Sequence, residues 1–197
     1  MKTLMTLTLT LFAATPVLAD CPVAADLAGG VRMVETNGTV NLFTAQADGR
    51  VQNDGVAPGG YMYRNVLVKG THLAELGDTD GVNYLPDTRR TVTYPQMDAG
   101  MPVPTPNTSA RYETTITTTS GSYPETQTQS WGAQTTLTIG ACTYDMIPGK
   151  ITYTNSDFVV FEGLHYLPEL SLALLYSYQI EGDRADIYEA ATIEAVR

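Results

Sequence analysis

Two histidines are the first candidates for acid–base chemistry, because histidine is the side chain whose ordinary pKa lies closest to neutral pH. His72 falls within an expected strand, and His165 precedes the run Tyr166-Leu167-Pro168. A secreted hydrolase would need one of them within hydrogen-bond reach of a serine or a carboxylate. The chain has no Gly-x-Ser-x-Gly motif, and no residue is assigned a catalytic role. We expect no enzymatic activity and no cofactor, and we keep a secreted hydrolase as the alternative.

Acidic side chains gather in one turn-rich stretch that has half the pattern of a calcium loop. Asp78, Asp80 and Asn83 bring oxygen ligands close together along the chain. The closing glutamate of such a loop is missing at the proper distance. We therefore expect no metal site, with these three residues as weak calcium candidates. A calcium-stabilised extracellular interaction module is the second alternative function.

A pair of carboxylates across one cleft would suit a glycosidase. The glutamates of the second half of the chain are spread over expected strands and turns, and they are Glu113, Glu125, Glu162 and Glu169. Their spacing does not bring any two of them to one cleft. They therefore receive no role from the sequence.

The two cysteines, Cys21 and Cys142, are predicted to form a disulfide. A redox or metal-binding pair is the alternative, but no Cys-x-x-Cys motif is present. A disulfide between them would close a loop of about 120 residues and contribute roughly 4 to 5 kcal/mol to the stability of the fold. It would tie the start of the mature domain to its second half.

The N-terminus has the pattern of an export signal. Lys2 precedes an apolar run from Leu4 to Ala14, which is too short and too polar to span a bilayer, and Ala19 offers a small residue for cleavage. We predict a signal peptide over residues 1–19 and a single mature domain over residues 20–197. Asp20 breaks the pattern of a lipoprotein signal, which requires a small, uncharged residue before the cysteine. The expected location is the periplasm or the exterior, in a Gram-negative bacterium.

A net charge of −10 argues against two classes of partner. Nucleic acids and anionic membrane surfaces are both polyanions and would repel the chain. The composition suits one domain with a sizeable core, and the abundance of threonine and tyrosine favours strands.

Turn signals divide the chain into about ten expected strands, which is typical of an antiparallel curved sheet, half-barrel, barrel or sandwich. Asn37-Gly38, Asn155 to Asp157 and Glu181 to Asp183 are the expected hairpin turns. The prolines between residues 95 and 109 predict a loop. The expected strands are 31–36, 40–45, 61–69, 72–76, 88–94, 111–119, 125–142, 150–154, 158–161, 170–178 and 184–196, the last of them with a helix as the alternative.

Alternating apolar residues predict an inner face in the second half of the chain. Leu137 and Ile139 share one face of a strand, and Leu172, Leu174 and Tyr176 share one face of another. If the sheet is curved, these faces are expected to line an apolar ligand site.

Two runs resemble a known family of exported proteins. They are Gly140-Ala141-Cys142-Thr143-Tyr144 and Tyr166 to Leu174. The second resembles the aromatic-x-Pro-x-Leu-Gly-Leu hairpin of exported β-rich proteins of Gram-negative bacteria, including the periplasmic lipoprotein-carrier half-barrels, with Ser171 in place of the glycine. The resemblance covers the C-terminal part alone. It implies an apolar concave face for a lipid or acyl group and no catalytic residue.

The sequence thus predicts a non-enzymatic exported β-domain that binds an apolar small molecule, such as a lipid, or a protein partner of the cell envelope. The identity of the ligand, the oligomeric state and the order of the strands do not follow from it.

Overall fold

The computed structural model describes residues 21–96 and 100–197. The predicted signal peptide lies outside the described residues. None of the helices in these two ranges has the length and the apolar character needed to cross a bilayer.

The described chain forms one antiparallel sheet of 14 strands and a short 3-10 helix, η1 (Ala24–Ala28). All-β architecture is therefore confirmed, but the prediction of about ten strands is wrong. The strands are β1 (Val31–Glu35), β2 (Val40–Ala45), β3 (Val51–Val56), β4 (Met62–Val68), β5 (His72–Asp78), β6 (Arg90–Thr93), β7 (Ser109–Thr118), β8 (Gly121–Trp131), β9 (Thr135–Ile139), β10 (Cys142–Thr154), β11 (Val159–Leu167), β12 (Leu172–Ile180), β13 (Asp186–Ile187) and β14 (Ala190–Ala195).

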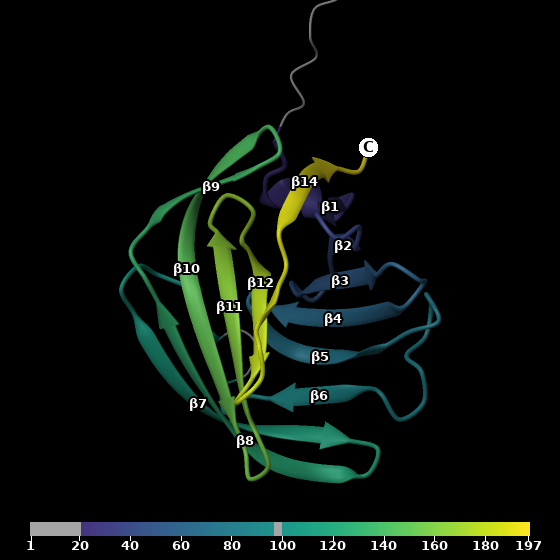
Figure 1. Ribbon diagram of the computed structural model, residues 1–197, viewed down its shortest axis with the longest axis vertical. Helices are drawn as coiled ribbons and strands as arrows, with labels where there is room; N and C mark the ends of the chain where they lie inside the picture. Colours follow the sequence, from purple (N-terminus) through teal and green to yellow (C-terminus); the bar gives the residue numbers. More distant parts are fainter. Residues whose placement is uncertain (1–20, 97–99) are drawn as a thin grey trace, which may run out of the picture.

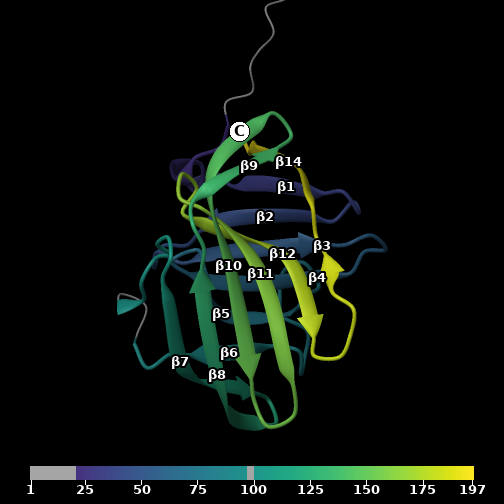
Figure 2. The same cartoon turned by 60° about the vertical axis from the view of Figure 1, so that its left-hand side comes forward.

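The sheet bends back on itself so that its two halves face each other. In Figure 1, β3 to β6 run across the long axis of the molecule and β10 to β12 run along it, and in Figure 2 β1 and β2 also run across it. The long strands β7 and β8 curve from one group to the other, as Figure 2 shows from a second side. This bend creates an interior between the two halves.

The segment that contains β13 and β14 pairs with both ends of the strand order. β13 pairs with β12, and β14 pairs with β1 at the opposite end of the order. Between them, the N–H of Tyr188 donates to Tyr176 O at 2.9 Å, and the N–H of Thr36 donates to Glu189 O at 2.8 Å. The sheet is not closed by a continuous ladder, but this segment crosses the gap.

Local turn chemistry explains where most strands begin and end. Asn37-Gly38 joins β1 to β2, Asn155 to Asp157 joins β10 to β11, and Glu181 to Asp183 separates β12 from β13, as predicted. The expected strands 111–119 and 125–142 leave residues 121–124 outside any strand, but these residues begin β8. The expected strand over 125–142 divides into β8 and β9.

The two halves also meet at a pair of turns. Gly70, in the turn between β4 and β5, accepts a hydrogen bond from the N–H of Ala173 at 2.8 Å. A side chain on Gly70 would lie 2.0 Å from the carbonyl oxygen of Ser171, and its φ of +65° also favours glycine. Ser171 itself has a φ of +50°, a left-handed conformation that glycine adopts more readily than serine.

The end of the molecule near η1 is densely packed. The predicted disulfide between Cys21 and Cys142 is present, with the Cα atoms 5.5 Å apart. Around Cys142, β9, β10 and β12 pack against η1 and the first strands in one apolar cluster. Leu167, Leu170 and Leu172 have no exposed surface there. We refer to this cluster as the packed end.

Candidate functional site

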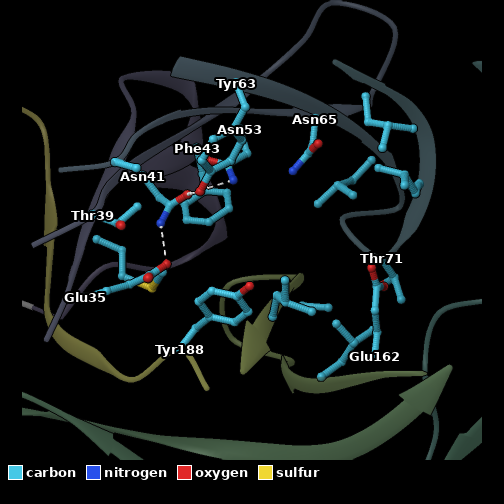
Figure 3. Close-up of a pocket in the computed structure, with 18 of the residues that line it drawn as sticks. Glu35, Thr39, Asn41, Phe43, Asn53, Tyr63, Asn65, Thr71, Glu162 and Tyr188 are labelled. Carbon is cyan, nitrogen blue, oxygen red and sulfur yellow. Dashed lines mark hydrogen bonds between the residues drawn. The ribbon is translucent and has the colours of Figure 1, made fainter. Parts of the chain in front are cut away.

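Beyond the packed end, the interior contains a cavity of about 370 Å³. It lies between the inner faces of β1 to β5 and those of β10 to β12, and Figure 3 shows its wall. The apolar and aromatic lining residues are Met33, Phe43, Ala57, Tyr61, Tyr63, Leu67, Leu73, Leu76, Tyr153, Leu164, Ala173, Leu175 and Tyr188. The polar ones are Glu35, Thr39, Asn41, Asn53, Asn65, Thr71 and Glu162.

A chain of hydrogen bonds runs along the wall formed by β1 to β4. Glu35 is only 7% exposed, and its Oε1 accepts from Nδ2 of Asn41 at 2.9 Å. Oδ1 of Asn41 accepts from Nδ2 of Asn53 at 2.9 Å and from the hydroxyl of Tyr63 at 2.8 Å. Figure 3 shows these side chains reaching toward one another from neighbouring strands. We call these four residues the Asn ladder.

The carboxylate fixes the direction of every bond in the Asn ladder. An ionised carboxylate only accepts, so Asn41 must turn its NH₂ group toward Glu35 and its oxygen toward the next strand. Asn53 must then turn its NH₂ group toward Asn41. Oδ1 of Asn53 is consequently a buried acceptor, and it has no hydrogen-bond donor among the described residues. Such a group is costly to leave unpaired.

Glu162 stands on the opposite wall, on β11. Its Oε2 accepts a hydrogen bond from the hydroxyl of Tyr153, on β10, at 2.7 Å. Burial raises the pKa of Glu162 to about 7, the bond from Tyr153 opposes this rise, and the negative charge of Glu125 adds to it. Burial also raises the pKa of Glu125, whose Oε1 accepts from Gln127. Glu162 therefore titrates near neutral pH.

The cavity continues in two directions. It shares Tyr61, Tyr63, Asn65 and Leu76 with a groove that also contains Asp78, Asp87 and Arg90, near the loop that follows β5. On the other side it shares Leu73, Leu76, Tyr153 and Glu162 with a smaller cavity of about 110 Å³. Tyr153 and Glu162 thus stand where the two cavities meet.

The residues predicted to line a ligand site lie elsewhere. Ile139, Leu172 and Leu174 are buried within the packed end, and Leu137 packs against it. The cavity wall on β12 consists of Ala173 and Leu175 instead. Tyr176 stacks on His165, with ring centroids 4.3 Å apart. Alternation correctly placed Leu172 and Leu174 on one face of β12. In this part of the strand, however, that face packs within the packed end and does not line the cavity.

The histidines are held by structural contacts. His72 is 2% exposed, its Nε2 lies 2.8 Å from Pro102 O, and its Nδ1 lies 3.1 Å from Nε2 of Gln129. One ring nitrogen therefore donates to the carbonyl and the other accepts from the amide. Burial lowers the pKa of both His72 and His165. Within residues 21–96 and 100–197, neither imidazole forms a hydrogen bond with a serine or a carboxylate.

The weak calcium candidates form ordinary turn contacts. Oδ1 of Asp80 accepts from the backbone N–H groups of Val82 and Asn83, and these bonds lower the pKa of Asp80. Oδ1 of Asp78 accepts from the hydroxyl of Tyr61. In the part of the chain that the structure describes, no group of three or more His, Cys, Asp or Glu side chains is arranged to hold a metal ion.

No family model, curated protein or solved structure matches this chain. The likeness to lipoprotein-carrier half-barrels accordingly depends on the two sequence runs alone.

Sequence reasoning missed the Asn ladder, although a signal for it exists. Asn41, Asn53 and Asn65 recur at intervals of twelve residues, and each lies inside one of three successive strands. Asparagine is depleted in strands, and its recurrence at the spacing of one hairpin predicts a polar row across a sheet. In the sheet, Asn53 pairs directly with Asn65.

Proposed function

We propose that this protein is an exported, non-enzymatic binding protein that holds a small, mostly apolar ligand in the cavity between the two halves of its sheet. The observation that supports this most strongly is the cavity itself. Its volume of about 370 Å³ falls within the range of roughly 300 to 1,000 Å³ that is typical of small-molecule sites. Its lining, mostly apolar with a few converging polar groups, has the composition of such sites.

The apolar surface supplies the driving force for binding. Met33, Phe43, Leu67, Leu73 and Leu164 present hydrocarbon to the cavity from both walls. Each CH₂ group of a ligand that leaves water there contributes about 0.8 kcal/mol. Eight such groups contribute about 6 kcal/mol before the cost of association is subtracted, so we expect dissociation constants no tighter than tens of micromolar.

Export is supported by the disulfide. The bridge between Cys21 and Cys142 is a type of bond that persists in oxidising compartments and is rare in the cytosol. Together with the sequence pattern of residues 1–19, it favours a periplasmic or secreted protein.

The first test is the material that the protein carries. The full chain is expressed with export to the periplasm and purified without detergent, and an organic extract is analysed by mass spectrometry. We expect a small molecule in stoichiometric amount. Calorimetric titration of the purified protein with 1-octanol provides a second measurement.

A matched pair of variants locates the site. Leu175 lines the cavity and Leu85 lies on a loop outside it, and the two side chains are similarly exposed, at 37% and 40%. Leu175→Trp should fill the cavity and lose both the retained molecule and the octanol heat. Leu85→Trp should keep both. An empty wild-type extract together with no heat from 1-octanol would refute the proposed function.

A further inference from the structure

Most of the tyrosines that line the cavity donate a hydrogen bond from their hydroxyl group to another side chain of the protein. Tyr61 donates to Asp78, Tyr63 donates to Asn41, and Tyr153 donates to Glu162. A hydroxyl group that donates a hydrogen bond to a neighbour has only its lone pairs left to interact with another molecule. These three residues therefore offer acceptors to a ligand. The ring of Tyr188 points into the cavity in Figure 3, and its hydroxyl group forms no hydrogen bond within the described residues.

The Asn ladder also provides an acceptor to the cavity. Asn41 donates to Glu35, and Asn53 and Tyr63 both donate to Asn41. Oδ1 of Asn53, a residue that is 8% exposed and lines the cavity, receives no hydrogen bond within the described residues. This is a second observation, made on an amide oxygen that carries no formal charge. One wall of the cavity therefore contains a buried acceptor that an N–H group of a ligand would satisfy.

The formal charge of the wall has one sign. Glu35 and Glu162 stand on opposite walls, and no lysine, arginine or histidine is among the residues that line the cavity. An anionic head group would meet two carboxylates and the unpaired Oδ1 of Asn53 in a partly enclosed space. A cation with N–H donors would meet partners for both its charge and its protons.

We infer that the ligand carries a protonated amine, and that its ammonium head binds between Glu162 and the Asn ladder while its hydrocarbon part lies against the leucines of the two walls. This inference rests on the proposed function, because it concerns the same cavity. It narrows the apolar ligand to a cationic amphiphile and disagrees with the neutral or anionic acyl group that the half-barrel resemblance implies.

Three probes with the same hydrocarbon chain test the inference: n-octylammonium chloride, 1-octanol and sodium octanoate. Each is titrated calorimetrically into the full, oxidised chain at about pH 8, where Glu162 is ionised. We expect octylammonium to bind at least about ten-fold more tightly than octanol, and octanoate to bind most weakly. Equal affinities for the three, or tightest binding of octanoate, would overturn the inference.

Glu162→Gln and its control identify the group responsible. The glutamine keeps an acceptor for Tyr153 and removes the charge, so the octylammonium affinity should fall by about ten-fold while the octanol affinity stays unchanged. Glu35→Gln should act in the same direction. Glu181→Gln, in an exposed turn, should leave all three affinities unchanged. A loss that is equal for octanol and octylammonium would show a structural effect and contradict the inference.

The two proposals fail in different ways. If octanol and octanoate bind but octylammonium has no advantage, the binding function stands and the amine is excluded. If none of the probes binds and the extract of the wild-type protein is also empty, both proposals are refuted.

Discussion

The packed end and the cavity are built partly from the same strand, but they differ in how closely their side chains pack and in how polar those side chains are. On β12, Leu172 has no exposed surface and packs beside the disulfide, whereas Leu175 is 37% exposed and lines the cavity. Around Leu172 the neighbours are apolar and closely fitted. Around Leu175 the wall contains carboxylates, amides and hydroxyls. The difference indicates that close apolar packing is concentrated at one end of the interior and that the other part remains a cavity.

The cavity departs from good core packing in two physical respects. It contains a buried acceptor without a donor, Oδ1 of Asn53, and a carboxyl group whose pKa is raised by burial, Glu162. Both features are destabilising in an empty protein. Such departures from locally consistent structure are expected at functional sites. The packed end has no need of them, because its role is to hold the curved sheet together.

The largest expected effect is the loss of the disulfide at the packed end. The double substitution Cys21→Ser, Cys142→Ser opens a loop that spans a sequence separation of 121. We expect the free energy of unfolding to fall by about 4 to 5 kcal/mol because the unfolded chain is no longer constrained. Urea unfolding followed by tyrosine and tryptophan fluorescence measures it. A change below about 1 kcal/mol would mean that the cluster holds this end without the bridge.

The second effect compares two leucines of β12 directly. Leu172→Ala removes a fully buried side chain and should destabilise the protein by about 3 kcal/mol, from lost burial and the void that remains. Leu175→Ala enlarges an existing cavity and should cost less than about 1 kcal/mol. Both values come from urea unfolding of matched variants. Similar losses at the two positions would remove the distinction between packed end and cavity.

The strands could be predicted from the sequence better than the site. The ends of a strand depend on a few neighbouring residues, whereas the site depends on residues that lie far apart in the chain. Asn37-Gly38 and Asn155 to Asp157 are local signals, and they position the hairpins of β1–β2 and β10–β11 correctly. The disulfide was equally accessible, because two cysteines allow one pairing. Two of the extra strands arose where an expected segment was divided, at the breaks between β8 and β9 and between β13 and β14, whereas β3 lies where no strand was expected.

The cavity depends on contacts that no local pattern encodes. Asn53 and Glu162 come from opposite walls, and only the bend of the whole sheet brings both to one space. Alternation also shows which residues share a face but not what that face meets. On β12 the register shifts at Gly163/Leu164 of the neighbouring strand, near the point where the strand leaves the packed end and reaches the cavity. The leucines were thus grouped correctly and given the wrong surroundings.

The third effect is similar in size to the loss at Leu172 and concerns the charge inside the cavity, through Glu162. In the folded protein its pKa is about 7, whereas a carboxyl group in the unfolded chain ionises at its ordinary, lower value of about 4.5. Between these two values the folded state binds more protons than the unfolded state, and stability therefore falls as pH rises. From about pH 4.5 to about pH 7.5 this group should lower the free energy of unfolding by about 3 kcal/mol.

Glu162→Gln separates this contribution from the rest of the molecule. The side chain of the variant cannot ionise, so the variant should lack this loss and be about 3 kcal/mol more stable than wild type at about pH 8, with little difference at about pH 4.5. Glu181→Gln, in an exposed turn, should retain the wild-type dependence on pH. Urea unfolding at a series of pH values measures all three proteins. If Glu162→Gln and wild type lose stability in parallel, Glu162 is already ionised at low pH, and the cavity carries its negative charge without a penalty to folding.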